Sequence, residues 1–298
     1  MADWHTRAII YQIDSALFYD LNGDGCGDIA GIAAKLRYIR RLGATVIWIT
    51  PFYLTPFLDE GYDVSDHLQV DPRFGQLADI IAFIEQAREL GMQVIIELLI
   101  QHTSDAHPWF QQARRSRRSP FRDYYLWADS DGDDLALEER YAVRTPMQWA
   151  GSAGGGFSAA DPQTFVAPMI DRGPFRYQKV NVADSLLHRH SPLHRIIDIA
   201  NTRSEFPEIA VAPFRIISTD RQAILGICYD DHERSVIAFL NFSDKPLRFT
   251  AKGIYAAVWT PCLADKTYAD ALTPGKHAKL EISAYGYRWF WTNSSALR

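Results

Sequence analysis

The sequence has no long uninterrupted apolar run, no large excess of basic residues and only three cysteines among its 298 residues. Without an apolar run of about 20 residues, we expect no membrane-spanning helix. The first residues, MADWHTRAIIYQID, contain neither a long apolar core nor a small-residue cleavage site, so we expect no signal peptide. The net charge of -5 argues against a general nucleic-acid binder, and no charged run suggests attachment to a membrane surface.

The cysteines are odd in number and far apart in the sequence, at Cys26, Cys228 and Cys262. This pattern is typical of free thiols in a reducing compartment, so we expect a cytoplasmic protein. A disulfide between Cys228 and Cys262 is the alternative.

Apolar residues make up 47% of the chain, enough for one large core or two smaller ones. The first third alternates short apolar runs of strand type with segments whose apolar residues recur at helical spacing. The expected strands are Ala8–Ile13, Thr45–Ile49 and Gln93–Ile100, and the expected helices are Ile32–Leu42 and Leu77–Ile84, with Gly43 and Gly91 as C-terminal stops. Repeated helix-glycine-strand units predict a parallel sheet with helices packed outside it.

The pattern changes after Trp127. The acidic segment ADSDGDDLALEER and the glycine-rich segment GSAGGGFSAADP predict a linker or loop region over about 128–182, with no core element in its glycine-rich part. A helix is then expected from Ser191 and Pro192, with the serine as N-cap and the proline in the first turn.

From Phe214 onward the pattern is that of an all-β domain. Short strands separated by turn signals predict a small antiparallel β-sandwich. The expected strands are Ala223–Tyr229, Ser235–Asn241, Ile254–Trp259 and Tyr287–Thr292. We place the domain boundary near Phe206-Pro207, which gives an α/β domain over 1–206 and a sandwich over 207–298.

The segment DLNGDGCGD has the spacing of a metal site. Asp20, Asn22, Asp24 and Asp28 stand at alternate or near-alternate positions, and the carbonyl of Cys26 is a further oxygen. A hard cation such as Ca²⁺ needs several oxygens about 2.3–2.6 Å away, which a tight loop can supply. An EF-hand would need a glutamate where Gly31 stands, so this is not an EF-hand. The alternative is an Asx-rich turn that holds no metal.

Several long segments resemble glycoside hydrolase family 13, the α-amylase family, and most of all its trehalose synthase and oligo-1,6-glucosidase branch. They occur in the family's order and cover nearly the whole chain. The segments are YQIDSALFYDLNGDGCGDIAGIAAKLRYIRRLGATVIWITPFYLTPFLDEGYDVSDHLQVDPRFG, HTSDAHPWF, VRTPMQWAGSAGGGFSAADP, VNVADS, RSEFPEI and YGYRWFW.

The resemblance implies a fold and a set of sites. The family's fold is a (β/α)₈ barrel with a C-terminal sandwich, and its chemistry lies at the C-terminal ends of the barrel strands. The DLNGDGCGD loop matches the family's structural calcium loop. Asp59 and Tyr62 match residues that hold a glucosyl ring, and His102 matches a histidine that hydrogen-bonds the same sugar.

The sequence departs from the family where the family's catalysis resides. Retaining glycosidases need two carboxyl groups about 5–5.5 Å apart. The family segments that carry the nucleophilic aspartate, the acid/base glutamate and a third aspartate have no counterpart in the 298 residues. The chain passes almost directly from the third barrel unit to the segment that follows the eighth strand. We therefore expect an α/β, incomplete (β/α)₈ TIM-barrel-like domain with no catalytic residue, followed by the antiparallel sandwich.

Two further departures lie beside His102. Where the family has an aspartate and an asparagine, this chain has Glu97 and Gln101, each one methylene longer. Longer side chains at both positions fit a remodelled barrel centre, and neutral drift is the alternative.

Three functions follow from these observations. The first in rank is a non-catalytic relative that binds an α-glucoside such as trehalose or maltose or regulates a homologue. The second is an active α-glucosidase or trehalose synthase-like enzyme completed by dimerisation or a partner chain. The third is a structural or assembly protein that binds no sugar. Since three parallel strands cannot close a barrel, we also expect a homodimer, or a partner chain that covers the open sheet edge.

Overall fold

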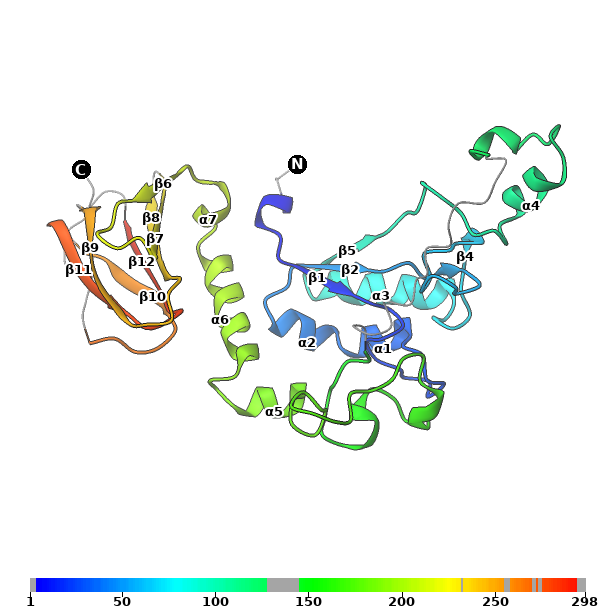
Figure 1. Cartoon of the computed structure of the whole chain (residues 1–298), viewed down its shortest axis with the longest axis horizontal. Coiled ribbons are helices and arrows are strands. Elements are labelled where there is room, and N and C mark those ends of the chain that lie inside the picture. Colours follow the sequence, from blue (N-terminus) through cyan, green and yellow to red (C-terminus); the bar gives the residue numbers. More distant parts are fainter. Residues whose placement is uncertain are drawn as a thin grey trace. The chain divides into compact units, whose positions relative to one another are not determined.

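The computed structural model describes residues 4–127, 145–231, 233–254, 258–269, 272 and 275–293. By their contacts the residues divide into two compact units, Ile9–Leu193 and Met1–Ala8 together with His194–Arg298 (Figure 1). The sequence boundary at Phe206-Pro207 lies at the far end of helix α6 (Pro192–Glu205), which begins just before this division. No helix of the described residues combines the length and the apolarity needed to cross a membrane.

The first unit contains the expected parallel sheet. Its strands are β1 (Ile10–Ile13), β2 (Val46–Ile49) and β5 (Gln93–Ile96), in the order β1-β2-β5. Helices α1 (Ile29–Ala34), α2 (Leu36–Arg41) and α3 (Leu77–Glu89) lie along one side of it (Figure 1). The core between them is aliphatic and aromatic, with Ile32, Ile39, Ile47, Ile49 and Phe83 fully buried.

Two expected elements of this unit differ from the prediction. The helix over Ile32–Leu42 is two short helices, because Lys35 has φ -102° and ψ 3° and breaks the regular turn. The strand expected to reach Ile100 ends at Ile96, opposite Ile49. Ile49 is also the last residue of β2, so β5 ends where its ladder partner ends.

A short antiparallel pair, β3 (Tyr53–Leu54) and β4 (Asp66–Val70), follows β2. The later segments of this unit are short helices and turns joined by irregular chain. They are α4 (Pro108–Arg115), η2 (Arg122–Tyr124), η3 (Ala153–Gly156), η4 (Pro162–Thr164) and α5 (Val182–Leu187).

Where the structure describes the predicted loop region over 128–182, it is irregular chain with the short turns η3 and η4, and α5 begins at its last residue. Residues 128–144 lie outside the described part. The glycine-rich segment forms no strand or α-helix, as expected, but it adds a side chain to the core. Phe157 is fully buried, and the nearby Trp149 donates from Nε1 to the Phe18 carbonyl at 2.6 Å. The segment needs no strand or α-helix to pack, because the Phe157 side chain enters the core from it.

The second unit begins with η1 (Trp4–Arg7) and continues with α6 and α7 (Glu208–Val211). The described residues of this unit form seven strands in two antiparallel sheets, β10-β12-β8-β7-β6 and β11-β9. They are β6 (Phe214–Ile217), β7 (Ile224–Asp230), β8 (Arg234–Asn241), β9 (Leu247–Ile254), β10 (Thr260–Ala264), β11 (Gly275–Ile282) and β12 (Tyr287–Asn293). Phe239 of one sheet contacts Phe249 of the other with ring centroids 5.1 Å apart, which confirms the predicted sandwich.

The strand expected over Ile254–Trp259 is wrong at both ends. Ile254 is the last residue of β9, and Trp259 is a buried residue that precedes β10, while 255–257 lie outside the described residues.

The prediction that the cysteines are free is confirmed. Burial raises the pKa of the Cys26 and Cys228 thiols to about 12, so both stay protonated at neutral pH.

Candidate functional site

A cavity of about 420 Å³ lies where β1 and β2 end. Carboxyl ends of parallel strands meet at one edge of a sheet, so residues that follow β1 and β2 converge there. The cavity is lined by Tyr11, Gln12, Ile13, Asp14, Leu17, Phe18, Thr50, Tyr62, Thr145 and Met147. Of these, only Tyr62 is among the sugar-binding residues that the sequence predicts.

The two strand ends are fixed to each other. The Ser15 amide donates to Thr50 Oγ1 at 3.0 Å, and the Ser15 hydroxyl donates to the Thr50 carbonyl at 3.3 Å. Both residues are buried. These bonds give the floor of the cavity a defined shape.

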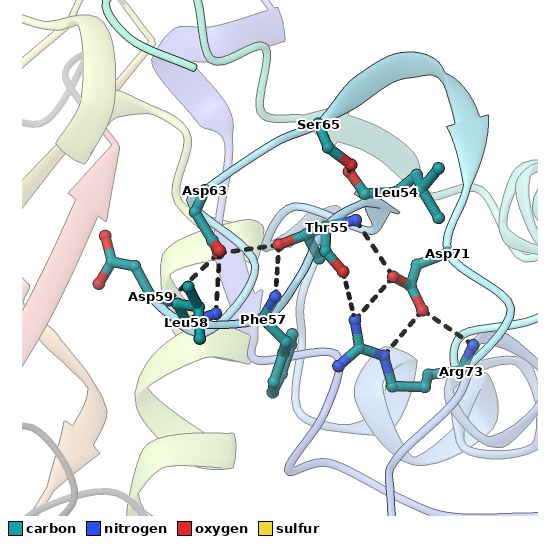
Figure 2. Close-up of polar contacts among 9 residues, drawn as sticks. All are labelled: Leu54, Thr55, Phe57, Leu58, Asp59, Asp63, Ser65, Asp71 and Arg73. Carbon is teal, nitrogen blue, oxygen red and sulfur yellow. Dashed lines mark hydrogen bonds and ion pairs between the residues drawn. The ribbon is translucent and has the colours of Figure 1, made fainter. Parts of the chain in front are cut away.

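The loop between β3 and β4 carries Asp59 and Tyr62. Two hydrogen-bonded side-chain pairs, Thr55 with Asp63 and Asp71 with Arg73, form the base of this loop, where its two ends meet (Figure 2). Arg73 Nη2 donates to the Thr55 carbonyl at 2.8 Å, and the Thr55 amide donates to Asp71 Oδ2 at 3.2 Å. The loop is thus attached to the segment that precedes α3.

The Asp71–Arg73 ion pair is half of this base. Burial would raise the pKa of the Asp71 carboxyl, but hydrogen bonds from Arg73 and its positive charge outweigh burial and hold that pKa below its ordinary value. Asp71 is 3% exposed, so its charge depends on Arg73 rather than on water.

The structure brings Tyr62 and His102 together. His102 Nε2 lies 2.9 Å from the Tyr62 carbonyl oxygen, and the Tyr62 amide donates to the Asp59 carbonyl at 2.9 Å. Tyr62 lines the cavity, while His102 is exposed and lines a neighbouring groove. The Asp59 carboxylate points away from the Thr55–Asp63 pair (Figure 2).

Glu97 and Gln101 lie beyond the end of β5. Glu97 Oε2 is buried and has no hydrogen-bond partner among the described residues, whereas Gln101 is exposed. The two side chains therefore have different surroundings. Their interpretation as a remodelled barrel centre stays a prediction.

The outer edge of β5 is apolar and exposed. In the described part of the chain β5 pairs with β2 alone. Leu68, Leu98 and Ile100 are 95%, 65% and 85% exposed and line a groove of about 480 Å³ together with His67 and Trp109. Sequence reasoning predicted an open edge but not this groove, because β4 and α4 supply part of its lining.

The loop predicted to hold calcium is folded by its own side chains. Asp20 accepts from the amides of Gly23 at 2.7 Å and Gly25 at 2.8 Å, and Asp28 accepts from the Leu21 amide at 3.0 Å. Asp28 also caps α1 by accepting from the Gly31 amide. These bonds form the Asx-rich turn.

The donor types of this loop suit a hard cation. Asp20, Asn22, Asp24 and Asp28 offer side-chain oxygens, each carboxylate oxygen has more than one lone pair, and Cys26 offers a carbonyl. However, no group of three or more histidine, cysteine, aspartate or glutamate side chains in the described residues is placed to share one metal ion. Calcium in this loop stays a prediction.

Sequence comparisons place the N-terminal half of the chain among known proteins. Residues 12–139 match the family described as "Alpha amylase, catalytic domain". A probable alpha-glucosidase of Rhizobium meliloti is 46% identical over 160 residues, which are 54% of this chain and 27% of that protein. An oligo-1,6-glucosidase of a Bacillus strain is 44% identical over 150 residues, 50% of this chain and 30% of that protein. The chain thus spans less than a third of the length of these relatives.

Structure comparisons extend over both units. A crystal structure of the trehalulose synthase MutB in complex with Tris covers 98% of this chain and 100% of that chain, with a TM-score of 0.82 and 15% sequence identity. The isomaltulose synthase of a Klebsiella species gives a TM-score of 0.77 at 14% identity, over 97% of this chain and 99% of that chain. At such low identity the similarity shows the fold, and it confirms the predicted incomplete barrel-like domain with its sandwich.

Proposed function

We infer that this chain, whose residues 12–139 belong to the α-amylase family, binds a glucosyl unit of an α-glucoside at the cavity beyond β1 and β2 and does not cleave it. One observation carries this proposal. Tyr62 lines the cavity, its carbonyl lies 2.9 Å from the His102 ring, and its amide bonds the Asp59 carbonyl, so the three predicted sugar contacts form one connected group.

The relatives support the substrate class. The similar curated proteins are named as an alpha-glucosidase and an oligo-1,6-glucosidase. Maltose, trehalose and isomaltose-type sugars are accordingly the ligands to test first. A cavity of about 420 Å³ lies within the range of small-molecule sites.

The lack of cleavage is argued from carboxyl groups. Hydrolysis by the retaining route needs two of them, about 5–5.5 Å apart. Asp14 is the one carboxylate that lines the cavity among the described residues. Because one carboxyl group cannot act as both nucleophile and acid, binding without turnover is the proposed outcome.

A titration tests the binding proposal. We expect calorimetry to detect weak maltose binding by the unaltered chain, and Tyr62→Ala to weaken it at least tenfold, about 1.4 kcal/mol. Tyr285→Ala removes an equally large side chain that is 71% exposed in the second unit, and it should bind as the unaltered chain does. Equal affinities of the Tyr62 and Tyr285 variants would reject the cavity as the site.

We propose in addition that the DLNGDGCGD loop binds Ca²⁺ through its oxygens. A ligand that binds only the folded state at 100 times its dissociation constant adds about 2.7 kcal/mol of stability. The chain stripped with EDTA should therefore melt about 5 °C higher once Ca²⁺ is restored. Asp24→Asn, an exposed change in the loop, should abolish that shift. Equal melting temperatures with EDTA and with Ca²⁺ would reject calcium binding and favour an Asx-rich turn that holds no metal.

A further inference from the structure

The carboxylate of Asp63 stands at the base of the loop that carries Asp59 and Tyr62 (Figure 2). Its Oδ1 accepts from Thr55 Oγ1 at 2.8 Å and from the Asp59 amide at 3.1 Å, and its Oδ2 accepts from the Leu58 amide at 2.9 Å. One side chain thus binds the loop at three points.

The backbone of this loop has a conformation that must be stabilised by surrounding contacts. Phe57 has φ 63° and Glu60 has φ 54°, both in the left-handed region that residues with a side chain seldom adopt. Gly61 follows with φ 96°. Such a conformation persists only where surrounding contacts over-determine it. The hydrogen bonds to Asp63 lie directly across this stretch.

Thr55 links the two ends of the loop. Its hydroxyl donates to Asp63 and accepts from the Phe57 amide at 2.9 Å. Thr55 is 6% exposed, and its carbonyl is in turn held by Arg73. A hydroxyl is needed at this position, because only a hydroxyl can both donate and accept here.

Charge matters as well as shape at Asp63. All three of its partners are donors, and a carboxylate has acceptors at both oxygens. An asparagine would place an NH₂ group against either the Leu58 amide or the pair formed by Thr55 and Asp59. That arrangement sets donor against donor and removes at least one of the three bonds.

We propose that Asp63 is a positioning residue for sugar binding. It fixes the loop from Phe57 to Gly61 so that Tyr62 lines the cavity while the Asp59 carboxylate points away from the Thr55–Asp63 pair. The inference rests on the proposed function, since the geometry that Asp63 sets matters for sugar only if the cavity binds sugar. Asp63 touches no sugar in this account and acts through Asp59 and Tyr62.

Amide hydrogen exchange and maltose titration test the proposal together. Asp63→Asn should speed exchange at the Leu58 and Asp59 amides at least tenfold and weaken maltose binding at least tenfold, with exchange in α3 unchanged. Thr55→Val, which keeps the shape and loses the hydroxyl, should weaken binding about threefold to tenfold. Thr55→Ser, which restores the hydroxyl and loses a methyl group, should bind within about twofold of the unaltered chain.

If the shape of the Thr55 side chain mattered and its hydrogen bonds did not, the order would be reversed. Val would then be tolerated better than Ser at position 55, because Val keeps both branches of the side chain. Unchanged exchange at Leu58 and Asp59 in Asp63→Asn would overturn the proposal. If that variant does not fold, the Thr55 pair decides in the same way. If the unaltered chain binds no maltose, the proposed function fails, and the exchange rates alone still decide whether Asp63 holds the loop.

Discussion

Replacing Arg73 by methionine is expected to destabilise the protein by about 2 kcal/mol at pH 7. The change leaves the Asp71 carboxylate, 3% exposed, without the cation that lies 2.7 Å from its Oδ2. Removing one partner of a buried pair costs about 3–5 kcal/mol. The expected loss of about 2 kcal/mol lies below this range because the Arg73 side chain is itself 36% exposed, so water already screens the pair.

The loss should depend on pH in a defined direction. The folded-state pKa of Asp71 lies below its ordinary value of 3.8, so the pair stabilises the fold above that value. This contribution disappears as the pH falls through the folded-state pKa. Urea unfolding of the two proteins should therefore show a difference at pH 7 that shrinks as the pH falls below 4. Arg40→Met, at an exposed position of α2, should change stability little at either pH. An equal loss for Arg73→Met at both pH values would contradict the account.

The chain is expected to self-associate, with a mass by light scattering of twice the 33.9 kDa of one chain. We propose that a second copy covers the edge of β5. Leu98 and Ile100, 65% and 85% exposed, follow the end of β5 beside that edge, and within the described residues β5 pairs with β2 alone. A two-fold axis would let the same apolar edge meet itself.

Introducing positive charges beside this edge should dissociate the proposed dimer. The double change Leu98→Lys and Ile100→Lys is expected to give a particle of half the mass at micromolar concentration, with the same helix content. Leu187→Lys, at an 82% exposed position of α5, is the matched control and should leave the mass unchanged. A compact single chain for the unaltered protein would refute the edge-to-edge arrangement, and a larger complex formed only in the presence of another protein would favour a different partner.

Much of the fold could be predicted because periodic apolar patterns fix elements locally. The runs at Thr45–Ile49 and Tyr287–Thr292 became strands close to their expected limits. The break at Lys35 could not be predicted, since helical spacing continues through it. The early end of β5 depends on where β2 ends, which is a pairing between distant segments.

The candidate site likewise contains residues that local sequence predicts and contacts that it does not. Asp59, Tyr62 and His102 were found from motifs that are continuous in sequence. Their support was not found, because Arg73 reaches the Thr55 carbonyl across 18 residues and Trp149 reaches the Phe18 carbonyl across 131. Such bonds leave no periodic signal in the sequence. Asp63 lies in the first of the long quoted segments, directly after Tyr62, but only the fold shows from which amides it accepts hydrogen bonds.

Saturation-transfer NMR on maltose incubated with the purified chain tests the central claim most directly, because one sample reports both binding and cleavage. The account predicts transfer of saturation to the glucosyl protons, and no glucose signal after prolonged incubation. Glucose that appears in proportion to the protein, and that disappears in both Glu97→Gln and Asp59→Asn, would show an active enzyme and contradict the account. Absence of any saturation transfer to maltose, trehalose or isomaltose would contradict the proposed sugar binding.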